Sequence, residues 1–233
     1  MSWSEFLPPN AIIMRRNGAG PTAEAAAVPA RDFAAQPAAD SLARVSAELS
    51  ADDGCRGCKL AQTRAHIVVG EGNPQARLLF IGESPGEPED KQARPFVGKD
   101  GELLDKMIVA MGLRREDVYL ANIIKCRTPD GREPEADEIA ACSSFLERQI
   151  ECIQPEVIVA LGSFAAQTLL QDTAPITQLR GSFREFKLRS GKPVKFMPTL
   201  HPEYLLRNPA AKRDAWDDLK QVAKALALEL PKK

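Results

Sequence analysis

The sequence lacks long apolar runs, an excess of charge of one sign, and all but two histidines. No stretch reaches the roughly 18 consecutive apolar residues that a membrane-spanning helix needs. The short apolar patch at 11–14 is followed by Arg15 and Arg16, whereas a signal peptide carries its basic residues before the apolar segment. We therefore expect a soluble, cytoplasmic protein without a membrane partner.

The net charge of −1 argues by itself against a protein that binds nucleic acid. The charges are unevenly distributed, however. Residues 180–233 carry 13 Lys and Arg against 6 Asp and Glu, while the first 179 residues carry 18 against 26. Basic side chains release counterions from phosphates, so a polyanion would meet the C-terminal third first. The alternative is a solvated helix face with scattered lysines.

The chain divides into an N-terminal arm and one domain. Residues 1–40 are rich in Ala, Pro and Gly and show no helical or strand period, which predicts a disordered arm. Residues 41–230 alternate apolar strands with amphipathic helices. This order predicts a three-layer α/β/α fold around a central, mainly parallel four-stranded sheet, with the ligand beyond the carboxyl ends of the strands. The expected strands lie at 76–83, 117–126, 156–162 and on both sides of a turn at 190–191, and the expected helices at 41–49, 101–113, 133–153, 163–170 and 210–230.

Four of the five cysteines form a candidate metal site. Cys55, Cys58, Cys126 and Cys142 have the spacing C-x2-C-x67-C-x15-C. Four thiolates can hold zinc or an iron–sulfur cluster, and spacing alone does not separate the two. The alternative for Cys126 and Cys142 is that they are ordinary buried thiols. Cys152 lies outside this pattern, as a core or surface thiol.

Several motifs in a fixed order carry a resemblance to a known family. They include GEGNP, GESPG, RPFVG, VYLANIIKCR, PEVIVALGSFAAQTLL and MPTLHPEYLLRNP, together with the C-x2-C loop. From about Leu42 to Leu226 the chain resembles the iron–sulfur uracil-DNA glycosylases of family 4. The resemblance implies a monofunctional enzyme, expected to be a monomer, that flips uracil out of single- or double-stranded DNA and hydrolyses its N-glycosidic bond, as in base excision repair. It also implies that the four cysteines bind a [4Fe–4S] cluster.

This sequence departs from related sequences at two places that affect the expected substrate and reaction. Ser84 stands where the family commonly has Ala, which leaves the range of accepted bases open. A related subgroup links covalently to uracil through a histidine in a basic insertion after the second motif. The corresponding segment here, KCRTPDGREPEADE, has neither the histidine nor the insertion. The sequence therefore predicts turnover rather than crosslinking.

The resemblance also assigns the residues around the base. Phe96 would stack on the flipped uracil, and Asn122 would read its N3–H and O4 edge, with a structural amide as the alternative. Gly82 opens the loop whose backbone N–H groups would bind a uracil carbonyl. Glu83 would activate water or stabilise charge on the sugar, or it could only hold its loop. His201 would donate to uracil O2 as a neutral imidazole.

Further residues would contact the DNA strand. Ser163 is expected to cap a helix whose free N–H groups suit a phosphate. Leu205 and Leu206 are expected to wedge into the base stack while Arg207 holds the backbone, although the first turn of a packed helix would also explain the leucines. Acidic residues at 89–90 would suit a helix N-terminus without any catalytic role.

Two other functions remain alternatives. The first is a non-catalytic iron–sulfur DNA-binding module of a repair or replication complex, with a degenerate pocket. The intact set of Glu83, Phe96, Asn122 and His201 argues against it. The second is a zinc nucleobase deaminase, which needs H-x-E followed by P-C-x-x-C. The sequence lacks that arrangement.

Overall fold

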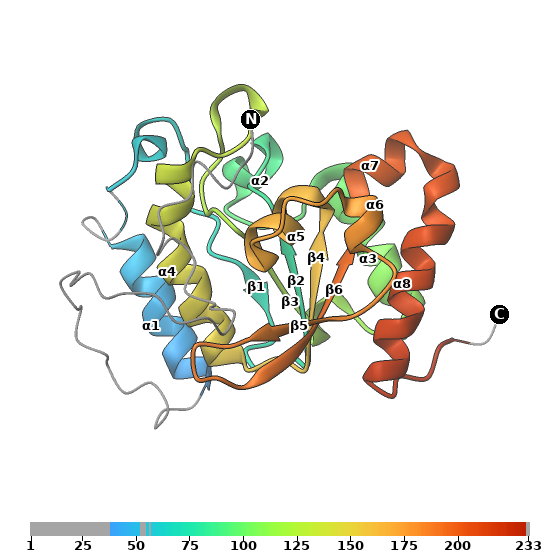
Figure 1. Ribbon diagram of the computed structural model, residues 1–233. Coiled ribbons are helices and arrows are strands. Elements are labelled where there is room, and N and C mark those ends of the chain that lie inside the picture. The colour runs from blue at the N-terminus through green and yellow to red at the C-terminus, as the bar shows by residue number, and fades with distance from the viewer. Residues whose placement is uncertain (1–37, 52–54, 56, 232–233) are drawn as a thin grey trace.

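The computed structural model describes residues 38–51, 55 and 57–231. The arm predicted for residues 1–40 therefore lies almost entirely outside the described residues. Helix α1 (Ala38–Ser50) covers the helix expected at 41–49 (Figure 1). Within the described ranges, no helix combines the length and apolar character required to span a bilayer.

A six-stranded sheet forms the centre of the fold (Figure 1). The strand order is β1-β3-β2-β4-β6-β5, and the inner strands β3, β2, β4 and β6 are mutually parallel. The expected count of four strands is therefore wrong for the whole sheet, because antiparallel β1 and β5 flank those four. The strands are β1 (Glu71–Gly72), β2 (Leu78–Gly82), β3 (Tyr119–Asn122), β4 (Val157–Leu161), β5 (Arg184–Lys187) and β6 (Pro193–Thr199).

Helices cover both faces of this sheet, which confirms the three layers. In β2, Leu79 and Ile81 face one core, and Leu78 and Phe80 face the other, as the two-residue period of a strand requires. All four are buried, and each such side chain contributes about 1.5–3 kcal/mol. The first core lies under α1, α4 (Ala136–Ile153) and α5 (Gly162–Leu170), and the second under α3 (Gly98–Ala110) and α8 (Lys212–Ala225).

Shorter helices lie in the connections. In Figure 1, α2 and α7 lie at the end of the molecule where the parallel strands end. Gly112, with φ +81°, follows the C-cap of α3, as its sequence position predicts. The short helices are η3 (Lys59–Gln62), α2 (Glu87–Gln92), η4 (Arg115–Asp117), η5 (Pro129–Gly131), α6 (Ile176–Leu179), α7 (Pro202–Arg207) and η6 (Pro209–Ala211).

The strand order creates a topological switch point at β2. After β2 the chain forms β3 on one side of it and then β4 on the other. The connections that leave these two neighbouring strands therefore diverge, and a crevice opens outside their carboxyl ends, where ligands of such sheets bind.

Candidate active site

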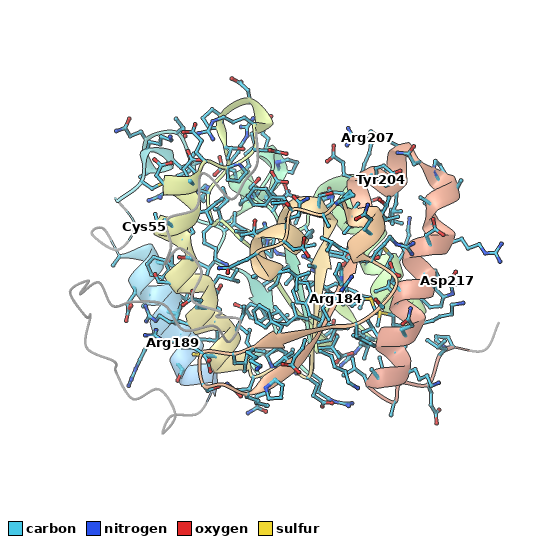
Figure 2. The ribbon with its side chains drawn as sticks, viewed as in Figure 1. Cys55, Arg184, Arg189, Tyr204, Arg207 and Asp217 are labelled. Carbon is cyan, nitrogen blue, oxygen red and sulfur yellow. The ribbon has the colours of Figure 1, made fainter. Side chains whose placement is uncertain are left out.

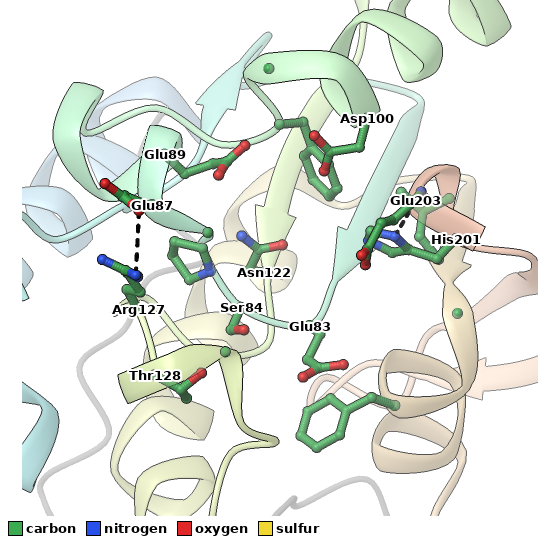
Figure 3. A pocket seen from close by; sticks show the side chains of 18 of the residues that line it. Glu83, Ser84, Glu87, Glu89, Asp100, Asn122, Arg127, Thr128, His201 and Glu203 are labelled. Atoms are coloured by element: carbon green, nitrogen blue, oxygen red, sulfur yellow. Dashed lines mark hydrogen bonds and ion pairs between the residues drawn. The ribbon is translucent and has the colours of Figure 1, made fainter. Parts of the chain in front are cut away.

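A cavity of about 780 Å³ opens at the carboxyl ends of the parallel strands. Each inner strand contributes to it. Glu83 follows β2, Asn122 ends β3, Gly162 follows β4 and His201 follows β6. Figure 3 shows Glu83, Asn122 and His201 around one open space. The sheet thus brings together residues that are far apart in the sequence.

The aromatic ring and the amide meet above Gly82. A Cβ atom at this glycine would lie 2.6 Å from Asn122 Oδ1 and 2.7 Å from Phe96 Cζ, closer than real Cβ contacts. The ring centroids of Phe96 and His201 are 6.4 Å apart, at an interplanar angle of 37°. The three side chains predicted to hold the base therefore surround a single space.

The position of Phe96 depends on contacts that the sequence did not reveal. Its backbone has φ +50°, a conformation that a non-glycine residue adopts at a cost. A Cβ at Gly101 would lie 2.0 Å from the Phe96 carbonyl oxygen, so only glycine permits this approach of α3. Arg115 donates to the same oxygen at 3.1 Å and pairs with Glu71 and Asp105. The one signal in the sequence for this close approach was Gly101, a glycine inside a helical pattern.

Glu83 is a half-buried carboxylate in the cavity. Burial, together with the nearby charges of Glu133 and Glu203, raises the pKa of Glu83 to about 7. Its side chain makes no hydrogen bond or ion pair with the part of the chain that is described. Ser84, the departure from the family pattern, lines the same cavity. The carboxylate is thus free to act on a ligand.

The proton of His201 has a defined position. The backbone N–H of Glu203 donates to His201 Nδ1 at 3.2 Å, at the start of α7. Since an N–H group can only donate, Nδ1 is the unprotonated nitrogen and Nε2 carries the hydrogen of a neutral ring. Burial lowers the pKa of His201, which keeps the ring neutral at physiological pH. The imidazole is therefore a hydrogen-bond donor through Nε2.

Glu89 and Asp90, in α2, hold neighbouring segments of the backbone. Asp90 accepts hydrogen bonds from the backbone N–H groups of Ala65 and His66, each at 3.0 Å. Glu89 accepts a hydrogen bond from the backbone N–H of Val97 at 2.9 Å, in the loop that carries Phe96. Both acidic side chains are buried. These contacts support the non-catalytic interpretation of the pair.

Helix α7 forms one side of the cavity mouth. Leu205 is only 1% exposed and packs with Leu200, so the expected wedge role is wrong for this residue. Leu206 is 39% exposed and Tyr204 is 44% exposed, and both line the cavity. Figure 2 shows Tyr204 and Arg207 together at this edge of the molecule. Tyr204 was missed, because nothing in the sequence fixed the rotation of so short a helix.

Ser163 lies in the first turn of α5 and lines the cavity. The helix begins one residue earlier, at Gly162, so Ser163 is not its N-cap as expected. Gly162 has φ +90°, and a Cβ there would lie 3.1 Å from His201 Cβ. The turn therefore brings the helix start close to the imidazole.

The four cysteines of the spaced pattern are neighbours in space. A hydrogen bond with Cys126 lowers the pKa of Cys55. Burial raises the pKa of Cys142 to about 11, and the charges of Cys55 and Cys58 also raise it. Among the described residues, no three His, Cys, Asp or Glu side chains are placed to hold a single metal ion. Cys152 is a buried thiol of the core.

Hydrogen-bond donors surround these sulfur atoms. Arg64 Nη1 donates to Cys126 Sγ at 3.3 Å, and the Leu60 N–H donates to Cys58 Sγ at 3.3 Å. The Lys125 backbone N–H donates to Cys142. Burial lowers the pKa of Lys125 to about 8. Burial raises the pKa of Cys58, and the hydrogen bond with Cys55 raises the pKa of Cys126, so a bound group has to displace the protons of these thiols. The N–H donors and the two cationic side chains can then stabilise the thiolate charge, so the donor set fits a group that binds four thiolates.

Comparison with known proteins agrees with this geometry. Residues 69–220 match the family model of the uracil DNA glycosylase superfamily. The chain is 49% identical over 155 residues to the type-4 uracil-DNA glycosylase of Thermotoga maritima, covering 66% of this chain and 79% of the relative. It is 42% identical over 187 residues to the Sulfurisphaera tokodaii enzyme of the same name, covering 78% and 83%. The Archaeoglobus fulgidus enzyme, also type 4, is 40% identical over 181 residues, covering 76% and 90%. The chain therefore belongs to the uracil-DNA glycosylase superfamily.

Proposed function

We propose that this protein removes uracil from DNA by hydrolysing the bond between the base and its deoxyribose. The observation that carries the proposal is the single cavity that Phe96, Asn122 and His201 share at the strand ends. A base must leave the helical stack to reach such a cavity, at a cost of a few kcal/mol. Stacking on the aromatic ring and hydrogen bonds to the base edge offset that cost.

Asn122 distinguishes uracil from cytosine. Its amide offers one acceptor and one donor, which match the N3–H and O4 of uracil. Cytosine presents an acceptor at N3 and a donor at N4, the reverse order. The side chain is buried and makes no hydrogen bond with a described residue, so an unmatched base would leave it unsatisfied. A buried polar group without a partner costs about 1–3 kcal/mol.

His201 and Glu83 act on the two sides of the breaking bond. As the N-glycosidic bond breaks, its electron pair passes to the uracil ring, and negative charge develops at O2. The Nε2–H of His201 donates to that oxygen, while the Glu83 carboxylate faces the positive charge on the sugar and orients the water that adds to C1′. The water oxygen bonds to C1′ and its released proton ends on the uracil anion, which gives free uracil and an abasic site.

The strand would be held at the rim of the cavity. Leu206, an exposed apolar side chain, would fill the space that the base vacates, and Arg207, an exposed cation, would hold the DNA backbone. The free N–H groups in the first turn of α5, around Ser163, suit a phosphate. The enzyme would act as a monomer on single- or double-stranded DNA.

The four cysteines would hold a [4Fe–4S] cluster. The mutual proximity of Cys55, Cys58, Cys126 and Cys142, and the donors around them, support this assignment over four unrelated thiols. The cluster would serve as a structural anchor for the segments that carry the cysteines. Protein with the cluster should be brown and contain four irons and four inorganic sulfides per chain, whereas a zinc protein would be colourless.

Cleavage of a uracil-containing oligonucleotide tests the function. Purified protein is incubated with a strand that carries one uracil, and alkali then cuts at abasic sites. We expect cleavage at uracil and none in strands with cytosine or thymine at that position. His201→Ala should lower the rate about 10²–10³-fold while DNA binding persists, since one donor to a developing oxyanion is lost. His66→Ala removes the other histidine, outside the cavity, and serves as the control. An uncut uracil strand would favour the non-catalytic DNA-binding module.

A further inference from the structure

Lys125 is a fully buried lysine between the active-site strand and the cysteines. Its side chain is 0% exposed. Among the described residues, no carboxylate pairs with its ammonium, and the acidic groups that raise its pKa are the thiols of Cys142 and Cys126. Burying an unpaired ammonium is expensive, so such a position calls for an explanation.

The polar groups of this one residue join three segments. Its Nζ donates to the Asn122 carbonyl oxygen at 2.9 Å, and its backbone N–H donates to Cys142 in α4. Its own carbonyl accepts from the Val68 N–H at 2.8 Å, in the segment that precedes β1. Asn122 is the last residue of β3, where the ladder with β2 ends at Gly82. The ammonium therefore supplies the donor that this carbonyl would otherwise lack.

We infer that Lys125 is a positioning residue that couples the cysteine site to recognition of the base. Its ammonium holds the Asn122 carbonyl, while its backbone precedes Cys126 and donates to Cys142. Lys125 thereby joins the cysteine segments to the end of the strand from which the Asn122 amide enters the cavity. This inference rests on the proposed function. It predicts that a change at Lys125 weakens the binding of uracil itself, beyond any effect on the cysteines.

Arg64 provides a matched control. Its guanidinium donates to Cys126 Sγ at 3.3 Å and to the Cys55 carbonyl at 3.1 Å, so it also brings a cation to the cysteines. Arg64 does not line the cavity that contains Asn122. Arg64→Met thus removes a positive charge from the cysteines alone, whereas Lys125→Met removes that charge together with the hydrogen bond to Asn122.

Binding of free uracil to the holoprotein separates the two effects. For wild type, Arg64→Met and Lys125→Met, iron content is measured first, followed by Kd for free uracil, Kd for undamaged DNA, and kcat and KM on the uracil strand. We expect Lys125→Met to weaken uracil binding about tenfold and to lower kcat, with Kd for undamaged DNA unchanged. Arg64→Met should bind uracil within about twofold of wild type.

A second variant covers a folding failure. Lys125→Gln keeps a neutral hydrogen-bond donor, so it should bind uracil more tightly than Lys125→Met. If Lys125→Met does not fold, Lys125→Gln is compared with wild type and should bind uracil more weakly. Equal uracil affinity in the Lys125 and Arg64 variants, or wild-type affinity in both Lys125 variants, would overturn the inference. Wild-type protein that excises no uracil would overturn the proposed function instead, a result obtained before any variant is made.

Discussion

Gly82→Ala is the substitution that tests the geometry of the site most directly. The new methyl group would lie 2.6 Å from Asn122 Oδ1 and 2.7 Å from Phe96 Cζ, whereas ordinary contacts begin at 3.4 Å. Each partner must therefore retreat by about 0.7–0.8 Å. Asn122 is paired with β2 through the sheet, and Gly101 and Arg115 restrict the Phe96 backbone. Because the two backbones are held, the amide and the ring can make room only by changing their side-chain rotamers, which moves both away from their observed positions.

The magnitude follows from these displacements. A misplacement of about 1 Å in a site of this kind costs on the order of 10²-fold in rate, which corresponds to about 2.7 kcal/mol. Overpacking of a filled region costs about 1–3 kcal/mol of folding stability. For a domain of this size each kcal/mol lowers Tm by about 2–4 °C. We expect Gly82→Ala to remain folded but to lose about 10²-fold in kcat/KM.

Single-turnover cleavage of the uracil strand measures this loss, and calorimetry gives Tm. Gly57→Ala is the control, because a Cβ there meets nothing within 4 Å and the residue is exposed. It should retain wild-type rate and Tm. Wild-type kcat/KM in Gly82→Ala would refute the argument, since it would mean that the amide and the ring do not need their observed positions for excision.

Three further predictions follow from the same contacts. Because the pKa of Glu83 is raised to about 7, its carboxylate forms as the pH rises; kcat/KM should climb about tenfold per pH unit below 7 and level off above it, and Glu83→Gln should remove this dependence in a pH–rate profile. Leu206→Ala should reduce excision from double-stranded DNA more than from single-stranded DNA at unchanged Tm, whereas Leu205→Ala should cost about 2–5 kcal/mol in denaturant unfolding. Arg115→Met removes the support of the Phe96 carbonyl and should raise the Kd for free uracil several-fold, which titration calorimetry would detect; an unchanged Kd would show that the ring is held without it.

The raised pKa of Glu83 also makes the stability of the folded protein depend on pH. With its pKa raised to about 7, Glu83 keeps its proton in the folded protein up to about pH 7, while the unfolded chain releases it near the ordinary carboxyl value of 4.5. Between these values the folded state binds more protons, so this group favours folding at low pH, and its contribution decreases as the pH rises to 7. If Glu83 acts as proposed, excision should rise across this window while the contribution of Glu83 to stability falls.

The predictable parts of the fold are the elements that produce a pattern of apolar residues within a short stretch of sequence. Apolar runs identified β2, β3 and β4, and their polar carboxyl ends placed Glu83 and Asn122 at one edge of the sheet. Strand β1 escaped notice because two residues carry no period. Contacts between distant segments also escaped, such as those of Gly101 and Arg115 with the Phe96 loop. Both residues of such a contact are present in the sequence, but nothing in the sequence indicates that they lie together in the fold.

Adjacent leucines illustrate the same limit. Leu205 and Leu206 have identical side chains, and a six-residue helix gives too short a pattern to decide which one faces inward. Packing decides it, since Leu205 completes a cluster with Leu200 and Ala215 while Leu206 projects at the cavity mouth. The prediction that both form a wedge failed for this reason, and the exposed Tyr204 was overlooked for the same one.

Two kinds of buried polar side chain contrast scaffold with candidate site. Asp90 and Glu138 are buried with partners: Asp90 accepts backbone N–H groups, and Glu138 accepts from Arg132 and from the Glu135 N–H. Asn122, in contrast, is buried with its amide facing an open cavity, without a hydrogen bond to any residue in the described part of the chain. The amide therefore stays available to a ligand, while its backbone is fixed by the sheet. A ligand that offers the complementary donor and acceptor would gain both hydrogen bonds, and a ligand with the reverse order would leave the amide unsatisfied. If Asn122 reads the base as proposed, selectivity for a base edge arises from an amide that the fold holds in place without pairing it to a described residue.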